Sequence, residues 1–450
     1  MRYKFFAVLL ILSNSVLLLA IDRAEFQQRR QRAAALFHDG ILLVHATSRL
    51  NLMGDRFRQD PAFYYFTGLE NVASALLVID GQSGQSSLFL SMPAKSAALA
   101  ETMDAKSTAI LPVEISPGPE AARDLLFDRI EDWASLEGFL TQHASSMRTL
   151  YYVPQRFSLE ELPPSFGSQT EPAAPLWAVT LAKKWPALNL KDAGGAIYQL
   201  MAVQSAGEME SVRMAAKSTV LAVLAGMRAI RPGASQRSVE IGVENACWQN
   251  ARGVSFWPWA MSGEKGVFPR AWASLLRYDH LDGVLQSGDL VRLDVGCEWN
   301  HYQGDLGRTV PVSGHFTNAQ RETWNIFVSA YQAGVRSMRE GLTVEQLYDA
   351  WRYELVRHRE GAKTDLARKA IDSWSKRENV PFWGPHTMNL DAGFIQGPLR
   401  AGMTIDFEPI AAIEGQGYFL EDMILITRDG AEVLTPGVPY TAEEIEAFMK

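Results

Sequence analysis

Carboxylates interrupt apolar strand patterns in the second half of this chain, and they constrain its fold more than any other feature. The residues concerned are Asp294, Asp305, Asp406, Glu408 and Glu421. A single one of them is easily explained as a strand-end side chain that reaches water. Several buried together are costly, because an ionised carboxylate in apolar surroundings needs a partner and neighbouring carboxylates repel one another. Their repetition therefore favours a shared cation.

A histidine accompanies these carboxylates. His386 lies between the segment that contains Asp305 and the segment that contains Glu408. Imidazole nitrogens and carboxylate oxygens are together typical ligands of divalent metals. The sequence thus predicts a metal site, although spacing alone does not prove that the side chains converge in space.

The order of the expected elements indicates two domains, in agreement with a length of 450 residues. The first half alternates strands with helices, which predicts an α/β domain. Its expected elements are strands at 40–44, 64–68, 75–79 and 87–90, an Ala-rich helix at 95–102 and an exposed loop at 161–175. The second half is richer in strands and carries helices at 206–230, after Ser235, and at 317–340 and 343–359. We place the domains at residues 21–190 and 191–450.

Charge and cysteine content exclude some classes of protein. The net charge is −8 at pH 7, without the clustered Lys and Arg of a nucleic-acid footprint. Only Cys247 and Cys297 are present, so a disulfide framework is excluded. One bridge between them is an alternative, but we expect two buried free thiols.

The N-terminus carries a targeting pattern. Arg2 and Lys4 precede an apolar run over residues 5–20 that only Ser13-Asn14-Ser15 interrupts. This is typical of a secretory signal peptide, although an uncleaved anchor and a buried first helix are alternatives. We expect a secreted or periplasmic protein in which residues 1–20 are a signal peptide or anchor. Membrane contact is expected only through this segment.

Longer segments around the carboxylates resemble aminopeptidase P, which belongs to the pita-bread family with prolidase, methionine aminopeptidase and creatinase. The similar segments are 287–298, 304–312, 399–409 and 421–426, together with 25–31 and 63–68 near the N-terminus. The resemblance spans nearly the whole chain after residue 20. It implies a creatinase-like α/β domain followed by a pita-bread α+β catalytic domain. It also implies a homo-oligomer, either a dimer or a tetramer.

The resemblance also implies a site and a reaction. Asp305 and Glu421 would bridge two divalent metals, Asp294 would hold one of them, and His386 with Glu408 would hold the other. A metal-bridging hydroxide would attack the peptide carbonyl with Glu408 as general base, and would remove the N-terminal residue ahead of a proline. The oxygen-rich set favours Mn²⁺, with Zn²⁺, Co²⁺ or Fe²⁺ as alternatives.

Four positions depart from the family pattern. Arg277, Phe382 and Gly393 stand where the resemblance expects outer histidines, and Phe419 stands where it expects an arginine. In one hypothesis the protein remains a peptidase, with Arg277 or the nearby His280 as a substitute catalytic group. In the other, it is a divergent enzyme for a non-peptide or unusual small substrate, or a weakly active metal-binding protein. The substrate is accordingly a peptide or a small molecule.

Overall fold

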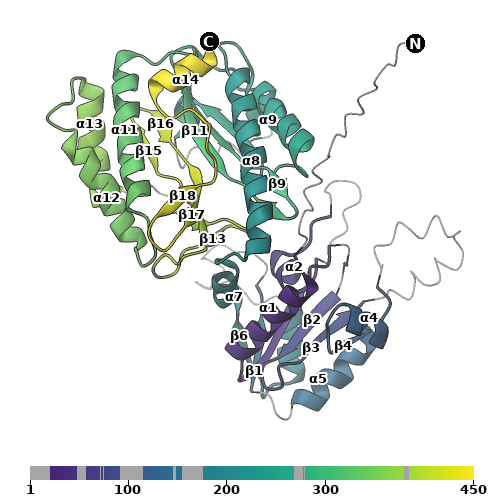
Figure 1. Cartoon of the computed structure of the whole chain (residues 1–450). Helices are drawn as coiled ribbons and strands as arrows, with labels where there is room; N and C mark the ends of the chain where they lie inside the picture. Colours follow the sequence, from purple (N-terminus) through teal and green to yellow (C-terminus); the bar gives the residue numbers. More distant parts are fainter. Residues whose placement is uncertain are drawn as a thin grey trace, which may run out of the picture.

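The computed structural model describes residues 21–47, 57–70, 72–73, 75–91, 115–144, 148–154, 176–267, 277, 279–379 and 385–450. They form an α/β domain beside a larger α+β domain, as the sequence predicts (Figure 1). The predicted signal segment, the Ala-rich helix at 95–102 and the loop at 161–175 lie outside these residues. Among the described residues, no helix is both long and apolar enough to cross a membrane.

The first domain is a mixed six-stranded sheet with the order β4-β3-β2-β1-β5-β6. The neighbours β1 and β2, and β2 and β3, are antiparallel, whereas β1 and β5, β5 and β6, and β3 and β4 are parallel. Its strands are β1 Gly40–His45, β2 Ala75–Asp80, β3 Ser86–Leu90, β4 Arg129–Asp132, β5 Thr149–Tyr152 and β6 Asn189–Asp192. Its helices are α1 Arg23–Leu36, α2 Pro61–Thr67, α4 Pro119–Asp124, η2 Trp133–Ser135, α5 Leu136–Ala144, α6 Leu176–Lys184 and α7 Gly194–Met201.

One predicted strand in this domain is wrong. Residues 64–67 belong to the helix α2, whose N-cap Asp60 accepts a hydrogen bond from the backbone N–H of Phe63. Pro61 fits the first helical turn, and Gly68 ends the helix in the left-handed conformation at φ 66°. Every residue from Ala62 to Thr67 is buried. A fully buried run has no polar face, so its periodicity does not separate helix from strand.

The second domain encloses its strands between two groups of helices (Figure 1). Sheets of three, five and two strands have the orders β11-β8-β7, β13-β12-β14-β17-β18 and β15-β16, and β9 pairs with β10. The strands are β7 Trp259–Ser262, β8 Leu290–Val295, β9 Glu298–Trp299, β10 Tyr302–Gln303, β11 Leu306–Pro311, β12 His386–Thr387, β13 Gly393–Phe394, β14 Thr404–Phe407, β15 Ile410–Ile413, β16 Gln416–Phe419, β17 Asp422–Ile426 and β18 Ala431–Val433. The helices are α8 Ala206–Ala229, α9 Gln236–Asn250, η4 Gly263–Gly266, η5 His280–Asp282, α11 Asn318–Ser337, α12 Val344–Arg357, α13 Asp365–Trp374, η6 Arg377–Asn379 and α14 Ala442–Met449.

Local sequence explains where the long helices begin. Capping boxes start α8, α11, α12 and α14, each with Ser or Thr at the N-cap and Glu or Gln three residues later. The predicted helices at 206–230, 317–340 and 343–359 are thereby confirmed within three residues at each end. The helices α13 and α14 were not expected from the sequence.

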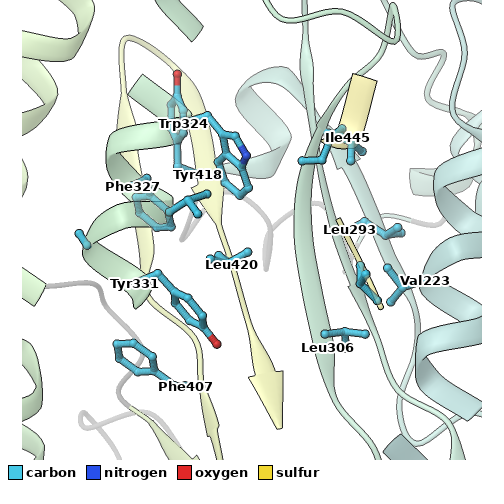
Figure 2. Packing of buried hydrophobic residues seen from close by; sticks show 14 of the residues in the cluster. Val223, Leu293, Leu306, Trp324, Phe327, Tyr331, Phe407, Tyr418, Leu420 and Ile445 are labelled. Atoms are coloured by element: carbon cyan, nitrogen blue, oxygen red, sulfur yellow. The ribbon is translucent and has the colours of Figure 1, made fainter. Parts of the chain in front are cut away.

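The two helix groups bury the strands from both sides. Figure 2 shows Trp324, Phe327 and Tyr331 of α11 packed with Tyr418 and other core residues, and Val223 of α8 beside Leu293 and Leu306. The rings of Phe327 and Tyr418 lie 6.3 Å apart, and those of Tyr331 and Phe407 lie 5.0 Å apart. This packing fixes the strands that carry the carboxylates.

Buried contacts join the two domains. Arg29 of α1 is fully buried and lies 3.1 Å from Glu208 of α8, which also accepts a hydrogen bond from Tyr302. The predicted boundary at residue 190 falls inside β6, so the first domain's sheet continues just past it.

The expectation of two free thiols is wrong, because Cys247 and Cys297 form a disulfide. An antiparallel bridge between Val254 and Cys297 brings the chain after α9 against the end of β8. The Cα atoms of the two cysteines are therefore only 5.2 Å apart, despite a separation of 50 residues. Sequence spacing gave no sign of this approach.

Candidate metal centre

Five ligand-type side chains meet where the sheets of the second domain approach one another. Asp294 is on β8, Asp305 precedes β11, His386 begins β12, Glu408 follows β14, and Glu421 lies between β16 and β17. An antiparallel bridge between Gly307 and Glu421 joins the edge of one sheet to the next. All five residues are at most 8% exposed. The topology thus converts five distant sequence positions into one buried cluster.

The distances within this cluster are those of a metal site. One ligand atom from each of Asp305, His386 and Glu421 lies within 4.8 Å of the other two. His386 Nε2 is 3.1 Å from Glu408 Oε1 and 3.9 Å from Asp305 Oδ2.

The buried carboxylates of the cluster outnumber its positively charged side chains. Burial raises the pKa of Asp305 and Glu421 well above their ordinary values, and the negative charges of neighbouring carboxylates raise them further. Burial likewise raises the pKa of Asp294 and of Glu408. Asp305 Oδ1 and Glu421 Oε2 are buried and accept no hydrogen bond. Divalent cations would neutralise these groups and occupy the unpartnered oxygens, so the donor set fits a metal.

His386 is oriented as a ligand. Its Nδ1 lies 3.2 Å from the carbonyl oxygen of Thr387. A proton on Nδ1 would donate to that carbonyl and leave Nε2, which faces Glu408 and Asp305, free to bind a metal. Burial by itself lowers the pKa of His386, but the hydrogen bond and charge of Glu408 outweigh it and the pKa is raised.

A second buried cluster holds the backbone of Glu421. Arg308 donates to the carbonyl oxygen of Glu421 at 2.6 Å and to Asp422 Oδ1 at 3.0 Å. Three hydroxyls complete the coordination of Asp422, from Thr435 at 2.8 Å, Tyr331 at 2.9 Å and Tyr440 at 2.6 Å. We name Arg308, Tyr331, Asp422, Thr435 and Tyr440 the Asp422 cluster.

Two residues of the site were given no role by the sequence analysis, although Asp406 was among its strand carboxylates. Asp406 is fully buried opposite His386 in the β12–β14 ladder, with its Oδ2 3.9 Å from His386 Nδ1 and neither oxygen hydrogen-bonded. Arg292 is 3% exposed and donates from Nη2 to Asp294 Oδ2 at 2.8 Å. Both follow a signal that was present in the sequence, since each is a charged residue two positions from a predicted ligand in an apolar strand.

Of the two proposed substitute catalytic groups, Arg277 and His280, the structure describes only the side chain of Arg277. Arg277 is exposed and donates two hydrogen bonds to Asp279, an acceptor outside the cluster. His280 begins η5, but its side chain is not among those described, and neither is Phe382. Gly393 pairs with Thr387 in the β12–β13 ladder and offers no side chain. The catalytic roles of Arg277 and His280 therefore remain predictions.

Comparisons with known proteins agree with this architecture. The model of metallopeptidase family M24 matches residues 210–428, and that of the aminopeptidase P N-terminal domain matches residues 26–151. Xaa-Pro aminopeptidases of Haemophilus influenzae and Escherichia coli K12 are 24% and 26% identical, and the alignments cover 95% of this chain and 98% of each relative. The structure of E. coli aminopeptidase P with the inhibitor Pro-Leu gives a TM-score of 0.71 at 25% identity, covering 96% of this chain and 98% of that one. The chain is therefore an aminopeptidase P-like member of the pita-bread metallopeptidases.

Proposed function

We propose that the protein is a dinuclear metallo-aminopeptidase that removes an N-terminal residue ahead of proline. The observation that carries this proposal is the buried set of five ligand-type side chains, in which Asp305 Oδ1 and Glu421 Oε2 accept no hydrogen bond. Full-length relatives with the name Xaa-Pro aminopeptidase support the choice of substrate. The oxygen-rich donor set favours Mn²⁺ over Zn²⁺, Co²⁺ and Fe²⁺.

Each side chain has a defined task in this proposal. Asp305 and Glu421 would contribute to both cation sites, Asp294 would hold one cation, and His386 with Glu408 would hold the other. When bound, divalent cations supply Lewis acidity toward the substrate carbonyl and toward water. Glu408 would accept and return the proton.

One feature favours a second candidate function, slow turnover of peptides or turnover of a different small substrate. Gly393 and Phe419 stand at positions where the family resemblance expects a histidine and an arginine. Neither side chain donates a hydrogen bond to a developing oxyanion or leaving group, and one such donor contributes about 10²–10³-fold in rate. Cleavage of Xaa-Pro bonds is therefore expected to be slower than in a relative that retains these groups.

The test combines metal analysis with peptide cleavage. Purified protein should bind about two Mn²⁺ per chain, fall sharply in metal content as Asp305→Ala, and release the first residue of a Xaa-Pro-Xaa peptide. Glu408→Gln should lower the cleavage rate about 10²–10⁴-fold with the fold retained. Metal binding with no cleavage in a Mn²⁺-supplemented peptide library would favour the second candidate. Stoichiometric metal in Asp305→Ala would contradict the assigned ligands.

We also propose export from the cytoplasm, with residues 1–20 as signal peptide or anchor. The Cys247–Cys297 disulfide supports an oxidising compartment, because disulfides rarely persist in a reducing cytosol. Cell fractionation measures where the protein is located. Its mass, with and without reductant before alkylation, shows whether residues 1–20 are retained and whether the two cysteines are oxidised. A full-length cytosolic protein with two free thiols would contradict this proposal. Light scattering would test the accompanying expectation of a dimer or tetramer.

A further inference from the structure

Arg292 is a buried cation in the metal centre for which neither the family resemblance nor the proposed mechanism has a role. Arg292 lies two residues before Asp294 on β8, so both side chains project from the same face of the strand. Its Nη2 donates to Asp294 Oδ2 at 2.8 Å, and the residue is 3% exposed. The hydrogen bond occupies one oxygen of Asp294 and leaves Oδ1 for a metal.

Aromatic rings fix the guanidinium of Arg292. Its central carbon lies 4.2 Å from the ring centroid of Phe419 and 5.1 Å from that of Trp259. Both contacts are within the range of cation–π attraction, which is strongest where water is excluded. These contacts and the hydrogen bond to Asp294 restrict the rotamers of Arg292. A guanidinium held in one orientation can fix the orientation of the Asp294 carboxylate.

The local backbone places Phe419 beside Arg292. Thr309 pairs with Arg292 in the β8–β11 ladder. The hydroxyl of Thr309 accepts from the backbone N–H of Phe419 at 2.8 Å and lies 3.1 Å from its carbonyl oxygen. A Cβ on Gly307 would lie 1.8 Å from the Phe419 ring, so the missing side chain makes room for this aromatic. The segment is built for an aromatic residue at position 419.

The resemblance to aminopeptidase P expects an arginine at position 419. Here an aromatic ring occupies that position, and a guanidinium reaches the ring from the neighbouring strand β8. Two nitrogens of Arg292, Nε and Nη1, are buried and donate to no acceptor. Its charge is therefore only partly neutralised by Asp294.

We propose that Arg292 is a positioning residue of the metal centre, which has taken over from strand β8 the cationic role that the family pattern assigns to position 419. It orients Asp294 through Oδ2 and so keeps Oδ1 in place for the cation that Asp294 would hold. The inference rests on the proposed dinuclear site, but its test does not depend on which substrate is cleaved.

The test measures metal affinity and the geometry at the metal. Loss of an outer hydrogen-bonding partner typically weakens metal binding about 10–100-fold. In Arg292→Leu, Mn²⁺ titration should show one weakened site and one nearly unchanged site, and the visible spectrum of the Co²⁺ form should change. Arg292→Lys should give an intermediate affinity, because it retains the charge and loses the planar fork. The matched control Phe419→Leu keeps the ion pair, and its effect should be smaller.

Exchange of the two positions is the decisive experiment. The double variant Arg292→Leu/Phe419→Arg should regain much of the affinity lost in Arg292→Leu, since it returns a guanidinium to the site from the other strand. Wild-type affinities and an unchanged Co²⁺ spectrum in Arg292→Leu would overturn the proposal. So would equal weakening in Phe419→Leu, which would indicate a packing role alone.

A measurement without metal separates this proposal from the proposed function. In chelator, the melting-temperature shifts of Arg292→Leu and Asp294→Asn should not add in the double variant if the two side chains form a coupled pair. Additive shifts would overturn the positioning role. Failure of wild-type protein to cleave any peptide would overturn only the proposed substrate.

Discussion

Glu421 and Asp422 are adjacent in sequence, fully buried and acidic, yet their surroundings are opposite. Asp422 accepts hydrogen bonds from Arg308, Tyr331, Thr435 and Tyr440. Glu421 lies among other carboxylates, and its Oε2 accepts none. Successive residues of a strand project to opposite sides, so one step along the chain separates the two environments.

The difference distinguishes Asp422, a carboxylate that stabilises the fold, from Glu421, a carboxylate with a proposed function. The protein supplies its own cation and three hydroxyls to Asp422, so that carboxylate needs nothing from solution. At Glu421 the compensation is incomplete, as expected for a site that receives its positive charge from a ligand. The two environments are also linked, because Arg308 bonds both Asp422 and the carbonyl oxygen of Glu421. The Asp422 cluster thereby positions Glu421, whose Oε2 accepts no hydrogen bond.

The largest expected effect comes from neutral substitutions at the two positions in metal-free protein. Asp422→Asn leaves Arg308 buried without its counter-charge, and breaking a buried ion pair costs about 3–5 kcal/mol. Glu421→Gln removes a carboxylate that has no counter-charge, so its unfolding free energy should change by no more than about 1 kcal/mol. Urea denaturation in chelator measures both values.

The same pair of variants behaves differently when metal is added. Mn²⁺ should stabilise wild-type protein and should have little effect on Glu421→Gln, because a bridging ligand is lost. Equal destabilisation by the two substitutions in chelator would refute the distinction between a compensated and an uncompensated carboxylate.

The next effect is the pH dependence of metal-free protein. Asp305 and Glu421 have raised pKa values when folded, so they retain protons that the unfolded chain releases above about pH 4. The unfolding free energy contributed by these groups therefore falls as pH rises above that value. His386 acts in the same direction, since its pKa is also raised and its stabilisation is lost as pH rises through the folded value.

Bound metal should remove this penalty. Stabilisation by Mn²⁺ should be larger at pH 8 than at pH 5, and should reach about 2.7 kcal/mol at a concentration 100 times the dissociation constant. Thermal unfolding at both pH values, with chelator and with Mn²⁺, checks the prediction. The variant Asp305→Asn is the control, and its stability in chelator should depend less steeply on pH. Greater stabilisation by metal at pH 5 would contradict the proposed origin of the pKa shifts.

The sequence was most informative where polar residues broke an apolar pattern. Asp294, Asp305 and Glu421 stand out because strands seldom bury carboxylates, and the structure places all three with His386 and Glu408. The same pattern contains Arg292 and Asp406, but spacing cannot show whether a charged side chain has a partner. That information depends on strand pairing, which places Trp259 and Thr309 around Arg292 from distant parts of the chain.

Other features depended on contacts that the sequence does not encode locally. Residues 64–67 lie in a helix whose N-terminus is capped by Asp60. Every residue from Ala62 to Thr67 is buried, so the sequence shows no helical period there. The Cys247–Cys297 bridge follows from the packing of the chain after α9 against β8. Capping boxes, by contrast, are local, and the long helices that they begin were predicted within a few residues.

The smallest effect tests whether the Asp422 cluster acts as separate bonds or as a unit. Thr435 is fully buried and donates to Asp422 Oδ1 at 2.8 Å. Thr435→Val keeps the shape of the side chain and removes that donor, while Arg308, Tyr331 and Tyr440 remain. The loss of one hydrogen bond should cost about 1 kcal/mol, and Mn²⁺ affinity should not change. Urea denaturation and Mn²⁺ titration of the same preparation measure both quantities. A cost as large as that of Asp422→Asn would mean that the donors stabilise the carboxylate cooperatively. In that case a fall in Mn²⁺ affinity should accompany it, because Arg308 would no longer hold the backbone of Glu421.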